Sequence, residues 1–324
     1  MFKSKKSLGQ NFLRSEKALA QIVEAAELKS EDVVLEIGPG QGALTEKLLA
    51  TARIVLAVEK DEELVAFLKD KFKKEISEKK LILINEDILK FKFTPSFLLP
   101  LNKGEAGWGS KSYKLVANIP YNITGEIFRK FLQEEKVQPE RMVLLVQKEV
   151  AERIVGSTKY EKLRKYEQIQ NSVERKKLFV DSDKFVLNPS GRTRVGSDRS
   201  LKESILSISV KVYGEPKYID TVRRGSFTPV PKVDSAILLI ENISRKRFLV
   251  NNVTEEDFFK IVKTGFAHKR KLLSSNLKPL LGNEVSGFLK ECMINEKARA
   301  EELKVEDWLC LATLQGEPRA LASY

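Results

Sequence analysis

Short apolar runs that read as strands alternate with amphipathic runs that read as helices, and this alternation limits the chain to few folds. The strand-like runs "DVVLEI", "RIVLAVE" and "KLILIN" are separated by the helix-like runs "ALTEKLLATA" and "EELVAFLKDKFKKE". Such spacing is typical of βαβ crossover units, which build a parallel sheet with ligand sites at the carboxyl ends of its strands. The sequence therefore predicts an α/β fold with a mostly parallel sheet.

The alternation continues to about residue 248 and then gives way to helical patterns. The runs "KLVANIPY", "RMVLLVQKEV", "ILSISVKVYG" and "SAILLIENI" extend the sheet pattern, and we expect "LSISV" to be a strand. Beyond them, Thr254 and Asp257 are spaced as a capping box at the start of a helix. We therefore predict one domain over residues 1–248 and a small α-helical domain over residues 249–324.

Two segments interrupt the alternation. Residues 94–112 are rich in Gly, Pro and Ser and show no period, which predicts a loop. Residues 156–205 carry 12 basic and 7 acidic side chains, a local charge of +5. That segment is far longer than an ordinary connection, so it is either a functional element or a partly disordered insertion.

The charge balance favours a polyanionic partner. The chain has 57 Lys and Arg residues against 45 Asp and Glu residues, a net charge of +12, and each phosphate that a protein neutralises releases condensed counterions.

No run approaches the roughly 18 apolar residues of a membrane span, and the N-terminus lacks a secretory signal. We therefore expect a cytoplasmic protein that does not enter a membrane.

Cysteine and histidine are scarce. Cys292 and Cys310 both lie in helix-like apolar patterns, and His268 is the one histidine. This composition predicts neither a disulfide framework nor a metal site.

A glycine-rich turn marks a candidate ligand site. Gly38, Gly40 and Gly42 follow a strand-like run and precede a helix-like run, so a ligand could approach the backbone at the helix N-terminus. The motif is ambiguous, because Gly38, Gly40 and Ala43 also satisfy the fingerprint of dinucleotide-binding proteins. A structural turn that needs positive φ is a third interpretation.

Carboxylates follow the next two strand-like runs. Glu59 ends "RIVLAVE", and Asp87 comes shortly after "KLILIN". Acidic groups at successive strand ends suit a ligand with hydroxyls, an adenine amine and a positive charge, which describes S-adenosylmethionine better than the pyrophosphate of NAD.

The stretch "VANIPYN" ends another strand-like run with groups that suit an adenine. The exocyclic amine of adenine is a poor nucleophile, so an enzyme that methylates it needs acceptors for both amine hydrogens. The side-chain oxygen of Asn118 and a backbone carbonyl of the turn at Pro120 can supply them, and proline stiffens such a turn. Tyr121 offers a ring on which an unstacked base can lie. The alternative is a polar turn with Tyr121 in the core.

Further residues could complete an RNA site. Phe227 precedes two prolines in "SFTPVPKVDS" and could cover the other face of the base, although a core position explains it equally well. Candidate phosphate contacts are found near the N-terminus and in the helical region; they are Lys3, Lys5, Lys6, Arg14 and residues 268–271.

These motifs together resemble the small-subunit ribosomal RNA adenine dimethyltransferase family, whose members dimethylate two adjacent adenines near the 3′ end of small-subunit rRNA. The resemblance covers nearly the whole chain outside the two interrupting segments. The matching pieces are "KKSLGQNFL", "VVLEIGPGQGALT", "AVEKD", "INEDIL", "VANIPYNIT", "VQKEVAERI", "LSISV", "FTPVPKVDSAI" and "GFAHKRKLLSSNL". So many collinear motifs favour S-adenosylmethionine over NAD.

The resemblance implies a Rossmann-like class I methyltransferase domain with a seven-stranded sheet, followed by a helical RNA-binding domain. It implies that Glu59 binds the ribose of S-adenosylmethionine, that Asp87 binds its adenine, and that Asn118 touches both the cofactor and the target amine. Tyr121 and Phe227 would enclose the target base. The implied cofactor site consists of Asn11, Leu13, Gly38, Gly40, Glu59, Asp87 and Asn118.

The same resemblance implies a partner and leaves rivals open. The implied substrate is a partly assembled small ribosomal subunit, and we expect the enzyme to act as a monomer. One rival is the related class that methylates one adenine of large-subunit rRNA; another is a noncatalytic RNA-binding assembly factor. The segment 156–205 departs from the family pattern, and we favour a dispensable insertion over an RNA-binding element.

Overall fold

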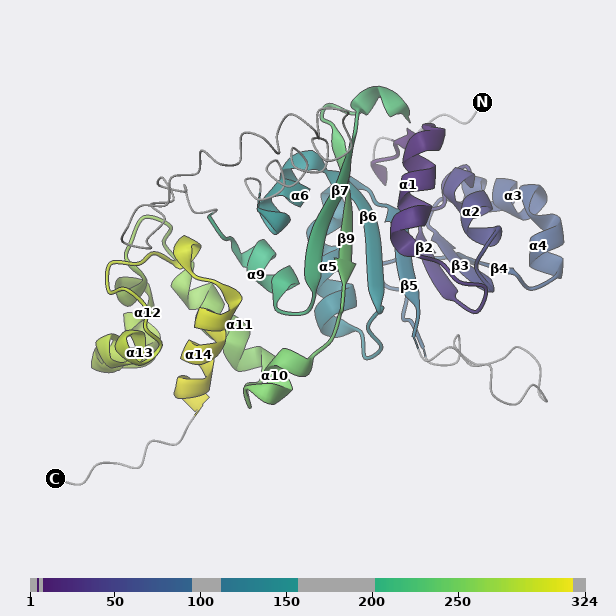
Figure 1. The fold of residues 1–324 in the computed structure, drawn as a ribbon. Coiled ribbons are helices and arrows are strands. Elements are labelled where there is room, and N and C mark those ends of the chain that lie inside the picture. Colours follow the sequence, from purple (N-terminus) through teal and green to yellow (C-terminus); the bar gives the residue numbers. More distant parts are fainter. Residues whose placement is uncertain (1–4, 6–7, 95–111, 157–201, 317–324) are drawn as a thin grey trace, which may run out of the picture.

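Seven strands form one sheet with helices on both faces (Figure 1). The computed structural model describes residues 5, 8–94, 112–156 and 202–316. The strand order is β4-β3-β2-β5-β6-β9-β7. Their bounds are β2 Val33–Ile37, β3 Ile54–Glu59, β4 Leu81–Asn85, β5 Lys114–Asn118, β6 Arg141–Gln147, β7 Glu215–Val222 and β9 Ser235–Glu241.

The sheet is mostly parallel, as predicted. Strands β4, β3, β2, β5 and β6 pair in parallel, whereas β9 is antiparallel to both of its neighbours, β6 and β7. The carboxyl ends of the parallel strands therefore meet at one edge, where the loops after β2, β3, β4 and β5 gather.

Side chains that alternate along the strands build a core on each face. Val34 packs in the core beneath α1, α2 and α3, whereas Leu35 packs in the core beneath α5 and α6. Burial on both sides explains why the central strands are continuous apolar runs rather than alternating ones. The helices of these layers are α1 Glu16–Ala26, α2 Ala43–Leu49, α3 Glu62–Lys71, α4 Lys73–Ser77, α5 Thr124–Arg129, the π-helical turn η4 Lys130–Glu134, and α6 Lys148–Val155.

The predicted strand at "LSISV" is wrong, because this segment is the helix α9, Ile205–Lys211. Ser204 and Ser207 form a reciprocal capping box that starts the helix, and this local pairing outweighs the strand preference of Ile and Val. The outer position of the sheet is taken instead by β7, whose side chains are only partly buried. Partial burial at a sheet edge left β7 without a clear apolar pattern in the sequence.

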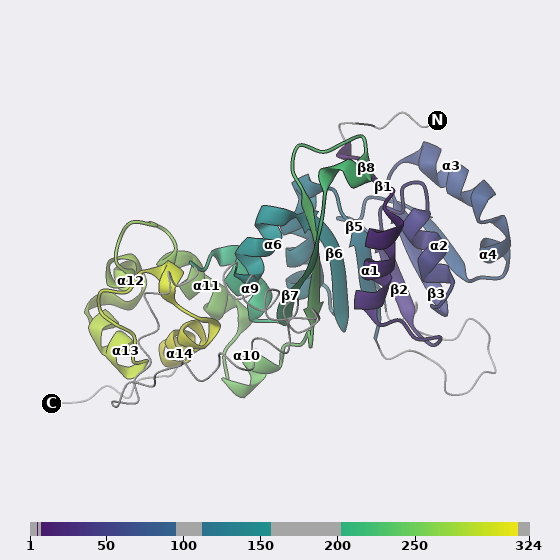
Figure 2. The same cartoon turned by 45° about the horizontal axis from the view of Figure 1, so that its top comes forward.

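A short antiparallel ribbon lies beside the main sheet. The strand β1, Phe12–Leu13, pairs with β8, Phe227–Thr228, and the two lie side by side in Figure 2. This pairing brings the N-terminal segment against a loop that is more than 200 residues away in the chain.

The C-terminal part is helical, as predicted, and Thr254 caps α11 through the backbone amide of Asp257. Its core is continuous with one face of the sheet, because Phe248 contacts both Tyr213 and Phe258. A Cβ built on Gly265 would lie 2.4 Å from the ring of Trp308, so this glycine permits close packing of α11 on α14. The helices are α10 Lys246–Val250, α11 Glu255–Gly265, α12 Leu273–Leu281, α13 Val285–Glu291 and α14 Val305–Gly316.

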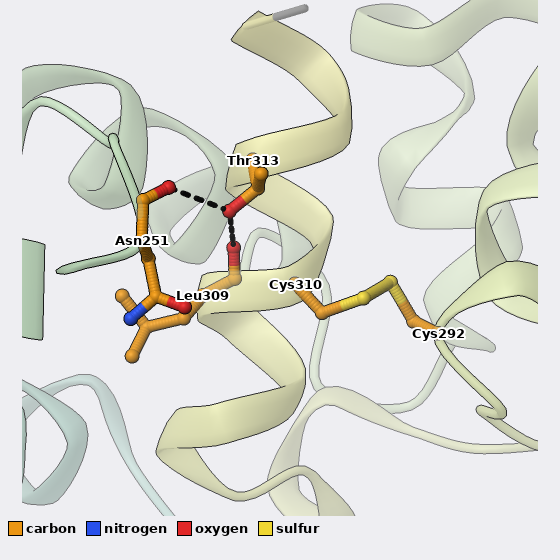
Figure 3. The surroundings of a disulfide bond; sticks show 5 residues. All are labelled: Asn251, Cys292, Leu309, Cys310 and Thr313. Atoms are coloured by element: carbon orange, nitrogen blue, oxygen red, sulfur yellow. Dashed lines mark hydrogen bonds between the residues drawn. A yellow bond between two sulfur atoms is a disulfide. The ribbon is translucent and has the colours of Figure 1, made fainter.

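A disulfide links the two cysteines, which corrects the expectation drawn from the sequence. Cys292 follows α13 and Cys310 lies in α14, and helix packing brings their Cα atoms to 5.9 Å, within bonding range (Figure 3). On another side of α14, the hydroxyl of Thr313 donates to two carbonyls, that of Leu309 in its own helix at 3.0 Å and that of Asn251 at 3.2 Å (Figure 3). The helix α14 is therefore tied to α13 and to the end of α10.

Residues 95–111 and 157–201, which make up most of the two interrupting segments, lie outside the described residues. The predictions of a loop over 94–112 and of an insertion over 156–205 stay predictions. Among the described helices, none is long and apolar enough to cross a membrane.

Candidate active site

A cavity of about 260 Å³ opens at the carboxyl edge of the sheet. The turn after β2, the ends of β3 and β4, and the turn after β5 all line it, together with residues 8–13. The glycine turn and the "NIPY" turn thus border one continuous space. Among the residues predicted from sequence, it brings together Asn11, Leu13, Gly38, Gly40, Glu59, Asp87, Asn118, Pro120 and Tyr121.

The glycine turn adopts a conformation that other residues would resist. Gly38, Gly40 and Gly42 have φ of 62°, 58° and 78°, and α2 begins directly after them. A Cβ at Gly40 would also lie 3.0 Å from the ring of Phe12, so a side chain there would crowd the segment that covers the cavity. The predicted turn between strand and helix is confirmed.

Glu59 is buried at the end of β3 and is held by backbone amides. Its carboxylate accepts hydrogen bonds from the amide of Gly40 at 3.2 Å and from the amide of Asp61 at 2.9 Å. Burial raises the pKa of Glu59, although both hydrogen bonds favour the ionised form. A hydrogen bond therefore joins the glycine turn directly to the acid at the end of β3.

Asp87 lies after β4, at the outer part of the cavity. Its carboxylate accepts a hydrogen bond from Lys60 at 2.9 Å and another from the amide of Leu89 at 3.0 Å. The bond from Lys60 is the main reason that the pKa of Asp87 is lowered. Asp87 is thus an ionised acceptor beside the cavity.

Asn118 ends β5 with a defined orientation. Its Nδ2 donates to the carbonyl of Asn11 at 2.9 Å. Because the amide nitrogen is occupied, the Oδ1 atom is the group that Asn118 offers as an acceptor, and no described residue donates to it. The pairing joins two residues that the sequence assigned separately to the cofactor site.

Tyr121 lies at the cavity, but Phe227 does not. The Tyr121 hydroxyl is 2.6 Å from the hydroxyl of Ser235, which fixes the phenol at its far end. Phe227 is 2% exposed and packs in the core beneath α1, where neither face of its ring is open to a base. Phe227 is therefore a core residue in this structure, which agrees with the second of the two interpretations of the sequence.

The N-terminal strap, which we define as Lys5 with residues 8–13, is clasped to Asp61. The Asp61 carboxylate accepts from the Lys5 ammonium at 2.7 Å and from the side-chain amide of Gln10 at 2.8 Å. Burial acts to raise the pKa of Asp61, but these hydrogen bonds outweigh it and lower the pKa. Lys5 is thus an ion-pair partner rather than a phosphate contact, and Lys3 and Lys6 lie outside the described residues.

We expect Asp61→Asn to weaken the clasp by a factor of at most about five, because the Lys5 end of the ion pair is exposed and solvent screens it. Asparagine keeps the N-cap of α3, so α3 should remain intact. Hydrogen-exchange protection of residues 8–13 at pH 7 should fall by up to about fivefold. In the wild type, protection from the clasp should be lost as the pH falls below about 4, because the lowered pKa of Asp61 makes its contribution present only while it is ionised.

Glu63 offers a matched control. Its carboxylate also contacts the Lys5 ammonium, at 3.0 Å, but its side chain is 68% exposed. Glu63→Gln should leave the protection of residues 8–13 nearly unchanged. Equal protection in Asp61→Asn and the wild type would show that other contacts hold the strap.

Three residues of the site were missed by sequence reasoning: Gln10, Glu36 and Asp61. Glu36 lies on β2, lines the cavity and is 1% exposed, and its Oε2 has no hydrogen-bond partner within the described part of the chain. Burial raises its pKa to about 8. The sequence did contain a signal for Glu36, because a carboxyl group within the apolar run "VVLEI" is unusual. No local pattern in the sequence indicated that Gln10 contacts Asp61.

Comparison with known proteins identifies the relatives of this chain. A family model described as ribosomal RNA adenine dimethylase matches residues 1–315. A protein of Dehalococcoides mccartyi named ribosomal RNA small subunit methyltransferase A is 37% identical, with 95% of this chain and 88% of that protein aligned. The protein of the same name from Crocosphaera subtropica is 34% identical over 95% of this chain and 97% of its own.

Solved structures agree on the fold. The 23S rRNA methyltransferase ErmE superimposes with a TM-score of 0.62 at 23% identity, covering 95% of this chain and 100% of its own. A dimethyladenosine transferase from Plasmodium falciparum also gives 0.62, at 24% identity, covering 93% and 95%. The family match over nearly the whole length and the curated relatives above 30% identity lead to one conclusion: the chain belongs to the ribosomal RNA adenine dimethylase family.

Proposed function

We propose that this enzyme transfers methyl groups from S-adenosylmethionine to the exocyclic amines of two adjacent adenines near the 3′ end of small-subunit rRNA. The observation that carries the proposal is the single cavity that joins the glycine turn to Asn118 and Tyr121. A methyl donor bound at the former can meet an amine held at the latter. The names of the curated relatives support the small subunit as the target.

The charges of the cavity suit S-adenosylmethionine. Four acids line it, Glu36, Glu59, Glu86 and Asp87, and Glu36 is mostly protonated at pH 7 because burial raises its pKa to about 8. The other three acids outnumber the one lysine among the lining residues, Lys60, which is paired with Asp87. Such a lining attracts a cation and repels a pyrophosphate. When bound, the cofactor supplies an activated methyl group on a positively charged sulfur. In this proposal Glu59 holds ribose hydroxyls and Asp87 the adenine amine, with Asn11, Leu13, Gly38 and Gly40 completing the site.

The target amine would be held by acceptors at the end of β5. Asn118 presents Oδ1 because its nitrogen is bound to Asn11. The carbonyl of Pro120 accepts from the amide of Ile123 at 3.3 Å, so we assign the second acceptor to the carbonyl of Ile119. Two acceptors fix both amine hydrogens and leave the nitrogen lone pair facing the methyl donor. The proton leaves after transfer, so no general base is needed.

Tyr121 would support the base by stacking, an interaction worth about 1–3 kcal/mol per base. Its hydrogen bond to Ser235 holds the ring in place before the base arrives. Phe227 could add a second ring only if β8 withdrew it from the core, so our proposal for stacking rests on Tyr121.

The proposal extends to partner and location. We infer that the enzyme acts as a cytoplasmic monomer on a partly assembled small subunit, with the helical region after residue 248 contacting RNA. The exposed residues 269–271 between α11 and α12 support this role, because they are three consecutive cations. The net charge of +12 also favours a nucleic-acid partner.

Methyl transfer from radiolabelled S-adenosylmethionine tests the proposal. Small subunits that lack the modification should accept label at two adjacent adenines, and large subunits should accept none. Label in large-subunit RNA would support the rival class of enzyme. If neither subunit is labelled while RNA is still bound, the chain is an assembly factor rather than an enzyme.

A further inference from the structure

Two consecutive arginines precede β8, the strand that pairs with the N-terminal strand β1. Arg223 and Arg224 lead into β8, which pairs with β1 so that Phe227 lies opposite Leu13. Arg14, the residue that follows the strap, donates its backbone amide to the carbonyl of Ser226 at 2.8 Å. Leu13 lines the cavity, so the backbones of all three arginines lie beside a ribbon that borders it.

The same turn is connected to the proposed base site. The backbone amide of Arg224 donates to the Asp234 carboxylate at 2.9 Å. The residue after Asp234 is Ser235, whose hydroxyl is 2.6 Å from that of Tyr121. The turn with both arginines is therefore bonded to the residue after the strap through Ser226, and to the residue before the hydrogen-bond partner of Tyr121 through Asp234.

The three side chains are exposed and have no carboxylate partner among the described residues. Nearby acids are already engaged: Glu16 pairs with Lys47, and Asp220 accepts from Gln21. Asp234 is engaged by the backbone of Arg224. The cations of Lys5 and Lys60, in contrast, are neutralised by Asp61 and Asp87.

Charge is therefore divided across the cavity. Three acids of the cavity lining besides the buried Glu36 outnumber its one lysine, whereas the β1–β8 ribbon beside the cavity is flanked by three arginines with exposed side chains. An acidic interior repels phosphate, so a nucleic acid that delivers one base into the cavity needs its backbone held outside it. Guanidinium groups suit this task because their planar forks bind phosphate oxygens in pairs.

We propose that Arg14, Arg223 and Arg224 form a phosphate rim that holds the RNA backbone on either side of the target adenine. The inference deepens the proposed function and rests on it, because it assigns a site to the strand that presents the base. The rim acts only on RNA and leaves the cofactor site untouched.

The double variant Arg223→Ala/Arg224→Ala tests the rim. Each phosphate contact with single-stranded RNA contributes about 0.7 to the slope of log Kd against log salt concentration. Loss of two contacts should lower the slope by about 1.4, which is an affinity loss of about 25-fold at 0.1 M salt relative to a 1 M reference. The probe is a fluorescein-labelled single-stranded 12-nucleotide RNA with two adjacent adenines, measured by anisotropy with S-adenosylhomocysteine present.

Two further variants separate charge at the rim from charge in general. Lys69→Ala/Lys73→Ala removes two exposed cations from the α3–α4 region, away from the β1–β8 ribbon, and should change the slope by less than half as much. Arg223→Lys/Arg224→Lys keeps both charges and should restore most of the slope, which a merely structural role of the arginines would not do. The affinity for S-adenosylmethionine should be equal in all four proteins.

The outcomes separate the rim from the proposed function. The proposed phosphate rim is wrong if Arg223→Ala/Arg224→Ala leaves the slope unchanged, or if Lys69→Ala/Lys73→Ala changes the slope equally. Either result refutes the rim even if small subunits are methylated normally. A wild type that places no label on small subunits overturns the proposed function, whatever the slope is. A lowered slope with normal cofactor affinity supports the rim.

Discussion

Replacing Asn118 with alanine should lower kcat of methyl transfer by about 10²–10³, the usual cost of losing one positioned hydrogen-bonding group at a reacting centre. In the proposed function the Oδ1 atom of Asn118 accepts a hydrogen bond from the target amine, and its orientation depends on the bond from Nδ2 to the carbonyl of Asn11. RNA affinity should change little, because most of it comes from phosphate contacts. Single-turnover methylation of unmodified small subunits, combined with RNA binding at fixed salt, measures the two effects separately.

Asn122 provides a control of the same chemistry. It lines the same cavity four residues away but is exposed, and no hydrogen bond of its side chain is found among the described residues. Asn122→Ala should therefore keep kcat within about threefold of the wild type. If Asn118→Ala also kept kcat within tenfold, the amine would be held by other groups and the proposed role of β5 would be wrong.

Loss of the disulfide should produce the largest change in stability. The bond between Cys292 and Cys310 closes a loop with a sequence separation of 18 residues, and loop-closure entropy assigns such a crosslink roughly 3 kcal/mol. The double variant Cys292→Ala/Cys310→Ala should lose about this much free energy of unfolding in urea. Reduction of the wild type should have the same effect, and methyl transfer at 25 °C should stay within about twofold, because the bond lies in the helical region, outside the cavity lining (Figure 3).

The second tie of α14 offers a comparison within the same helix. Thr313→Val removes the hydroxyl that donates to the carbonyls of Asn251 and Leu309 and keeps the shape of the side chain, so about 1 kcal/mol of stability should be lost. The reductant should have no effect on the double cysteine variant. If the reduced and oxidised wild type unfolded at the same urea concentration, the crosslink would contribute nothing to stability.

Much of the architecture was readable from the sequence because the decisive signals are local. The run "VVLEIGPGQGALT" contains a buried strand, a turn that needs positive φ and a helix in consecutive residues, and the structure has these elements there. Glu59, Asp87 and Asn118 were placed at or just after strand ends, and parallel strands necessarily bring such ends to one edge. Their meeting in one cavity follows from the sheet.

What the sequence by itself determined, then, is the order of elements, the edge at which the site forms and the family of the enzyme. Only the tertiary structure decided four features: that "LSISV" is a helix, that the two cysteines bond, that Phe227 is buried, and that Asp61 clasps the N-terminal strap. Three of these depend on contacts between residues far apart in the chain. The fourth is a helix that begins at a reciprocal cap between Ser204 and Ser207, while β7 takes the edge of the sheet.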